Sequence, residues 1–196
     1  MEIHNNAPVN EAYALRHFPN IDIEGFKVTS ELDFFYNCFA WAGEDNTRNW
    51  EPGSRYSHWL TDNPAYTLEN FIDNYSRIGY TELTKSSALE SDYEKIVIYV
   101  NDDGIPTHAA RQLESGKWTS KLGIREDIEH STPECIESDE YGVIKVILKR
   151  PNKQKYSNKT QETSKEFEKF KNLAKGIANV PKKEIDNAEK VKKEEN

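Results

Sequence analysis

One cysteine and one histidine in this 196-residue sequence have the types and the order that thiol chemistry requires. Cys38 lies in the apolar segment 34–42, which we predict to be a short buried helix with the cysteine near its first turn. The N–H groups of a first turn favour a thiolate, and a neighbouring imidazolium lowers the thiol pKa further. His108 lies in the predicted strand 107–113. The pattern therefore predicts a pair in which Cys38 attacks an acyl carbon and His108 is the general base.

A third group must orient the imidazole of such a pair. Asp127 and Gln112 are both candidates, and we favour Asp127 because a carboxylate stabilises an imidazolium better than an amide does. Backbone amides or Asn37 would hold the oxyanion, and the aromatic residues of the predicted loop 44–64 would line the substrate cleft. The predicted substrate-binding residues are Asn37, Trp50, Trp59, Gln112 and Ser120.

The same residues also allow simpler interpretations. Cys38 is flanked by phenylalanine and tryptophan, so it is equally a small core residue, and a histidine in a strand commonly bonds a carbonyl or a carboxylate. Zinc or iron ligands are available in His108, Asp127, Glu129 and His130, but their spacing matches no strong metal motif. We predict neither a metal site nor a cofactor.

The positions of these residues depend on a small number of elements. Segment 67–78 is predicted as a helix, because apolar residues recur at helical spacing, Thr67 is a natural N-cap and Gly79 follows. Shorter elements are expected at 11–17 as a helix and at 26–29 as a strand. The predicted antiparallel meander comprises strands 95–100, 107–113, 117–122 and 141–150. These elements predict an α+β fold in which a small sheet packs against helices.

Composition divides the chain into an acidic body and a basic tail. Residues 1–150 hold 26 Asp or Glu against 14 Lys or Arg, which argues against nucleic-acid binding. We predict a domain over 1–150, a polar linker over 151–164 and a charged amphipathic helical tail over 165–196. The chain contains no apolar run long enough to span a bilayer and no N-terminal secretory signal, so a cytoplasmic location is expected.

Several motifs resemble those of an uncharacterised bacterial family, a domain of unknown function, over roughly residues 30–150. They are NCFAWA at 37–42, THAARQ at 107–112, GKWTSKLG at 116–123 and DIEH at 127–130. More distantly, a helix bearing cysteine followed by a meander bearing histidine is similar to papain-like cysteine hydrolases of the NlpC type. That similarity implies a papain-like arrangement with Cys38 as nucleophile and His108 as base. The chain departs from papain because no Gln precedes Cys38, and from NlpC-type enzymes because His108 lies on the second hairpin strand.

Two functions follow from these patterns. The first is a cysteine-dependent acyl hydrolase or transferase, a peptidase or amidase of the thiol protease kind, acting on a protein or peptide. The alternative is a non-enzymatic protein-interaction module of a bacterial toxin or immunity system, with a partner docking on the C-terminal helix. No nucleic-acid or membrane partner is expected in either case.

Overall fold

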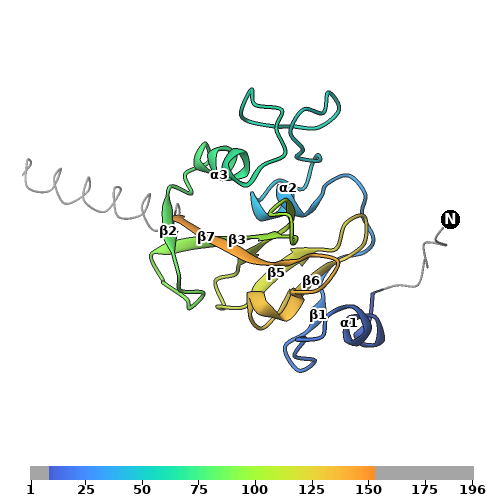
Figure 1. The fold of residues 1–196 in the computed structure, drawn as a ribbon. Coiled ribbons are helices and arrows are strands. Elements are labelled where there is room, and N and C mark those ends of the chain that lie inside the picture. Colours follow the sequence, from blue (N-terminus) through green and yellow to red (C-terminus); the bar gives the residue numbers. More distant parts are fainter. Residues whose placement is uncertain (1–8, 153–196) are drawn as a thin grey trace, which may run out of the picture. The chain divides into compact units, whose positions relative to one another are not determined.

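The computed structural model describes residues 9–152, which form an open seven-stranded antiparallel sheet (Figure 1). The strand order across the sheet is β1-β6-β5-β4-β3-β7-β2. Strands β3 to β6 form a meander, β7 returns to the far side of β3, and β2 pairs outside β7. The strands are β1 (Lys27–Val28), β2 (Glu82–Thr84), β3 (Tyr93–Val100), β4 (Pro106–Gln112), β5 (Trp118–Lys121), β6 (Asp127–His130) and β7 (Val143–Pro151).

The four helical segments of the described chain are short, and each α-helix begins at a side-chain cap. They are α1 (Glu11–His17), α2 (Cys38–Ala42), α3 (Leu68–Ser76) and the 3-10 helix η1 (Pro133–Ile136). The side chains of Asn10, Asn37 and Thr67 each accept a hydrogen bond from a backbone N–H in the first turn of the helix that follows. Figure 1 shows α2 and α3 on one side of the sheet and α1 on the other.

The sheet is buried on both faces, and alternate residues of each strand belong to different core clusters. We call the side under α2 and α3 the α2 face and the opposite side the α1 face. The α2 face includes Ile96, Ile98, Ala109 and Leu148, packed with Cys38, Phe39, Phe71 and Tyr75. The α1 face includes Val97, Tyr99, Ala110, Trp118 and Ile128, packed with Phe18, Ile136 and Tyr141.

Asparagine side chains fix the long segment 43–66 between α2 and α3. Asn37 bonds the backbone of Trp50 twice, donating to its carbonyl at 2.8 Å and accepting from its N–H at 3.2 Å. From α3, Asn74 accepts from the N–H of Leu60 at 2.8 Å. These backbone groups have no partner in a strand, and the asparagine amides satisfy them instead. The segment can therefore pack without regular secondary structure.

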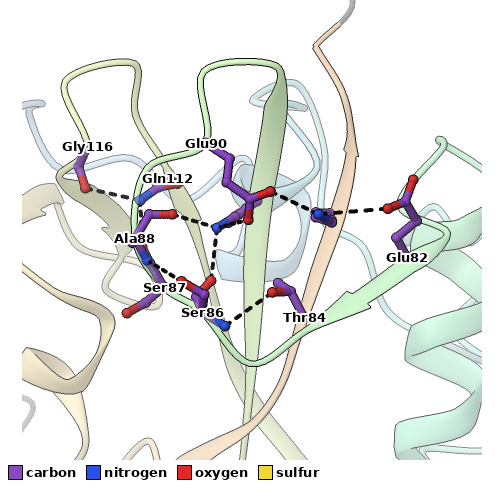
Figure 2. A network of polar contacts seen from close by, with 10 residues as sticks. Glu82, Thr84, Ser86, Ser87, Ala88, Glu90, Gln112 and Gly116 are labelled. Atoms are coloured by element: carbon purple, nitrogen blue, oxygen red, sulfur yellow. Dashed lines mark hydrogen bonds and ion pairs between the residues drawn. The ribbon is translucent and has the colours of Figure 1, made fainter.

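A buried lysine organises the loop 85–92 between β2 and β3. Lys95 Nζ donates to the carbonyls of Ser86 and Ala88, at 2.9 and 2.5 Å, and lies 2.6 Å from Glu90 Oε1 (Figure 2). An ammonium group has three donors, and these three acceptors satisfy all of them. The lysine therefore holds the loop against β3.

The predicted fold class is wrong in its arrangement. The described residues are mostly a seven-stranded antiparallel sheet with few short helices, and they show no papain-like arrangement. The helices expected at 11–17 and 67–78 and the expected strands are present, but β2 and β6 were not predicted. The predicted helical tail over 165–196, and the linker over 151–164 apart from its first two residues, lie outside the described residues.

Candidate functional site

The helix predicted in segment 34–42 begins only at Cys38, which therefore lies in its first turn, as predicted, but the thiol is part of the core. Its exposed fraction is 7%, and its neighbours in the cluster are aromatic and aliphatic side chains of the α2 face. Burial raises the pKa of the Cys38 thiol to about 12, although the backbone N–H of Ala109 opposes this shift. A first-turn N–H group that an oxyanion would need, that of Ala40, is already bonded to Asn37. Cys38 is therefore a protonated thiol at neutral pH.

His108 is fully buried on the other face of the sheet. Its ring stacks on Tyr141 with a centroid separation of 4.2 Å and lies 5.5 Å from the ring of Tyr99. Burial, assisted by the nearby His130, lowers the pKa of His108 to about 3. Neither ring nitrogen has a hydrogen-bond partner among residues 9–152. The imidazole is thus a neutral ring in the core.

The structure does not bring Cys38 and His108 together. Cys38 packs on Ala109, the strand residue next to His108, and side chains of successive strand residues point to opposite faces. The predicted pair fails for this geometric reason, since the sheet itself separates the sulfur from the imidazole. Sequence spacing alone left open which face of β4 the helix α2 would cover.

Asp127 belongs to a buried polar cluster on the α2 face, and its partners are not the predicted ones. Its Oδ2 accepts from the hydroxyl of Tyr36 at 2.7 Å, and its Oδ1 lies 3.8 Å from Lys121 Nζ. The Lys121 ammonium also lies 4.5 Å from the centre of the Tyr36 ring. We call Tyr36, Lys121 and Asp127 the Asp127 cluster.

Burial controls the protonation of all three members of the Asp127 cluster. It raises the pKa of Asp127, lowers the pKa of Lys121 and raises the pKa of Tyr36 above its ordinary value. The hydrogen bond from Tyr36 and the charge of Lys121 oppose the shift of Asp127 without reversing it. The sequence did not single out Tyr36 or Lys121 as site residues. A signal for the second was present, because Lys121 and Asp127 carry opposite charges and flank the 122–126 turn, where residues of two antiparallel strands face each other.

The predicted substrate-binding residues have structural partners and do not share a site. Asn37 caps α2, Trp50 is buried and donates its indole N–H to Asp45 at 3.0 Å, and Trp59 packs edge-on against Phe71. Gln112 donates to the carbonyls of Ser87 and Gly116, at 2.8 and 3.2 Å, as Figure 2 shows. Ser120 lies on the α1 face. These side chains order loops and caps.

Ser120 does form a pair with a histidine, but with His130. Its hydroxyl lies 2.9 Å from His130 Nε2, while His130 Nδ1 lies 2.8 Å from the carbonyl of Thr132. A carbonyl only accepts, so Nδ1 carries the proton and the Ser120 hydroxyl donates to Nε2. Both side chains are fully buried, and burial lowers the pKa of His130 to about 4. The pair is a satisfied element of the core.

An exposed apolar surface lies next to the Asp127 cluster. Phe34 and Phe35 stack on each other with centroids 4.8 Å apart, although their exposed fractions are 63% and 64%. Leu32 is exposed in the same segment, and Ile124 is exposed next to Arg125, whose carbonyl accepts a hydrogen bond from the N–H of Asp33. We call this surface the Phe34 patch, comprising Leu32, Phe34, Phe35 and Ile124.

The described residues meet neither the requirement for a metal site of three or more ligands nor that for a membrane-spanning helix. Within 9–152, no cluster of three or more His, Cys, Asp or Glu side chains has a geometry that would bind a metal. None of the helices in that range has the length and the apolar character needed to cross a bilayer.

The comparisons with known proteins identify the family. Residues 27–149, which include β1 to β6, α2, α3 and nearly all of β7, match the domain of unknown function DUF7689, and the chain belongs to that family. The resemblance to an uncharacterised family is thereby confirmed. No significant match exists among curated proteins or among solved structures.

Proposed function

We propose that this DUF7689 protein is a non-enzymatic interaction module that binds a cationic, apolar segment of a partner protein through the Phe34 patch. The observation that carries the proposal is the stacked, exposed pair Phe34 and Phe35. Aromatic rings of roughly 150–250 Å² each, two-thirds exposed, contribute about 250 Å² of apolar surface before Leu32 and Ile124 are added. The largest apolar patch of a soluble monomer measures about 300–600 Å² and is often functional.

The patch is held on a rigid backbone, which favours a binding role. Thr29 N–H donates to the carbonyl of Asp127 at 2.9 Å, and the Asp127 N–H donates to Ser30 Oγ at 2.8 Å. The carboxylate of Asp33 accepts from the N–H of Phe35 at 2.8 Å. Since the segment is already ordered by these bonds, a partner would lose little conformational entropy of this chain on binding.

The charge of the body favours a cationic partner. Residues 1–150 carry 26 acidic against 14 basic side chains, and Glu31 and Asp33 lie within the patch segment. Arg125, which follows Ile124 in the chain, places its guanidinium over the ring of Tyr13, 5.0 Å from the centroid. Acidic groups around an apolar centre complement a partner segment that mixes apolar residues with Lys or Arg.

The cysteine-hydrolase alternative has less support. It requires a thiolate beside an imidazole, whereas the thiol of Cys38 is buried with a raised pKa and His108 lies on the opposite face. A cytoplasmic location and a role in a bacterial toxin or immunity system stay predictions from the sequence.

A peptide-binding experiment tests the proposal. Labelled peptides that alternate Leu or Phe with Lys are titrated with the full chain and followed by fluorescence anisotropy, alongside matched peptides that carry Glu in place of Lys. We expect saturable binding of the cationic peptides that weakens with salt. The double variant Phe34→Ser/Phe35→Ser should bind at least about tenfold more weakly, or ~1.4 kcal/mol.

The matched control is Leu83→Ser, because Leu83 is 67% exposed but lies on β2, at the other edge of the sheet. This variant should bind as the wild type does. Equal affinity of the Phe34→Ser/Phe35→Ser variant, or the absence of binding to every cationic peptide, would overturn the proposal.

A further inference from the structure

We propose that Lys121 and Asp127 are joined by an intramolecular isopeptide bond, an amide between Lys121 Nζ and Asp127 Cγ that cross-links β5 to β6. The two residues are directly paired across the strands, and both side chains point to the α2 face. Their reacting groups lie within ion-pair distance, with 3.8 Å between Nζ and Oδ1. Because the strands already hold the two residues opposite each other, we expect side-chain rotation to bring Nζ to Cγ.

The pair differs from every other ion pair of residues 9–152 in that both side chains are buried. Lys95 is equally buried, but its three donors meet three acceptors, and its partner Glu90 is partly exposed. Lys121 has a single hydrogen bond, to the carbonyl of Arg125, and Oδ1 of Asp127 has no hydrogen-bond partner among the described residues. A buried ion pair at 3.8 Å whose carboxylate oxygen Oδ1 lacks a hydrogen bond is costly, and a neutral amide removes both charges.

The surroundings favour the neutral forms that react. Burial lowers the pKa of Lys121 and raises the pKa of Asp127, which promotes transfer of a proton from the ammonium to the carboxylate. The other charged groups that act on the pair are Asp33 and Glu126 on the lysine side and Arg111 on the aspartate side. The ring of Tyr36 covers Nζ and shields the pair from solvent.

The reaction balances without a further reagent. After a proton moves from Nζ to Oδ1, the amine lone pair attacks Cγ, and the new C–N bond forms as the Cγ–Oδ1 bond breaks. Oδ1 leaves as water, taking a second proton from the nitrogen. Tyr36, which donates to Oδ2 at 2.7 Å, stabilises the charge that develops on that oxygen. The products are one amide and one water molecule.

Mass spectrometry of the full chain under denaturing conditions tests this directly. We expect a mass lower than that of the sequence by one water molecule. Trypsin should fail to cleave after Lys121 and should release a branched peptide in which residues 118–125 are joined to residues 126–145. Fragmentation of this peptide should place the link between Lys121 and Asp127.

Two variants complete the experiment. Lys121→Arg keeps the positive charge but lacks the amine, so its mass should equal its own sequence mass, whereas Lys117→Arg, which alters a half-exposed lysine of the same strand region, should still lose water. Tyr36→Phe should lower the linked fraction. A wild-type chain wholly at the sequence mass, cleaved by trypsin after Lys121, would overturn the proposal. This outcome would leave the binding proposal for the Phe34 patch unaffected.

Discussion

Tyr36 donates its hydroxyl hydrogen to Asp127 Oδ2 at 2.7 Å, linking the residues just before α2 to strand β6. The two residues are 91 positions apart in the sequence, so this bond fixes the Phe34 patch segment against the sheet. The bond is buried, and the other oxygen of the same side chain, Asp127 Oδ1, has no hydrogen bond within the described residues. The Asp127 cluster is therefore a structural anchor for the surface above it.

Removing this hydroxyl should destabilise the protein. Tyr36→Phe removes the hydroxyl that donates to the buried Oδ2, which costs about 1–3 kcal/mol of unfolding free energy. Urea denaturation followed by tryptophan fluorescence measures the change. The control is Tyr56→Phe, at a side chain that is 91% exposed, where no measurable change is expected. Equal stabilities of the two variants would show that the Tyr36 hydroxyl contributes nothing.

Cys38 should react slowly with alkylating reagents in the folded protein. A thiol with a pKa near 12 is almost fully protonated at neutral pH, and its burial blocks access by the reagent. In a Cys135→Ala background, iodoacetamide at pH 7 should modify Cys38 far more slowly in the native state than in urea. Mass spectrometry over time gives both rates. A faster native reaction would restore the case for a thiolate.

The two buried histidines should make the protein sensitive to acid. Their pKa values are about 3 and about 4 in the folded state, against 6.5 for the ordinary group. Below pH 6.5 the unfolded chain binds protons that the folded chain does not, so the unfolding free energy falls as the pH falls. Each histidine contributes a loss of about 1.4 kcal/mol per pH unit, or about 5 kcal/mol for the pair between pH 6.5 and 4.5.

Substituting one histidine separates this effect from that of the carboxylates. His108→Phe keeps an aromatic ring against Tyr141 and removes one titrating group, so about half of the histidine contribution should disappear. Unfolding by urea at several pH values gives the slopes. Identical slopes in wild type and His108→Phe would contradict the assignment.

The sequence predicted those elements whose structure is determined by residues nearby in the chain. The Thr67 cap and the apolar stripe of α3 are such signals, and this helix formed where they predicted. β2 and β6 escaped prediction because their strand state depends on pairing with β7 and β5. The three residues of β2 are mostly exposed, and β6 alternates an isoleucine with polar residues.

The error at the candidate site has a different cause. A period of two shows that His108 and Ala110 share a face, but it does not show which face α2 covers. That choice is made by packing between distant segments, here by α2 against Ala109. Asp127 was identified as a site residue, yet its partners Tyr36 and Lys121 came from a loop and a strand that the predicted catalytic arrangement did not use.

The loop 85–92 should depend on the ammonium of Lys95. Lys95→Met keeps the length of the side chain but leaves the carbonyls of Ser86 and Ala88 without their donor and Glu90 without its closest cation. Because Glu90 is partly exposed, losing these charge-assisted hydrogen bonds costs about 1.5–3 kcal/mol. Limited proteolysis should show cleavage within 85–92, whereas the exposed control Lys85→Met should resist as the wild type does. Equal resistance of both variants would show that the loop is held by other contacts.

Gly142 should tolerate substitution far less than Gly104, although both lie in turns with nearly the same backbone conformation. Their φ angles are 75° and 76°, so alanine at either position costs about 1–2 kcal/mol through the left-handed conformation alone. A Cβ on Gly142 would lie 2.0 Å from the carbonyl oxygen of Val100, whereas nothing lies within 4 Å of a Cβ on Gly104. The obstacle at Gly142 is backbone of β3, which cannot move without breaking its pairing with β4 and β7. Urea unfolding should therefore show a loss of about 1–2 kcal/mol for Gly104→Ala and a loss of more than about 4 kcal/mol, or no folded protein, for Gly142→Ala. Similar losses for the two variants would mean that β3 and the 138–142 turn are not packed as closely as this contact requires.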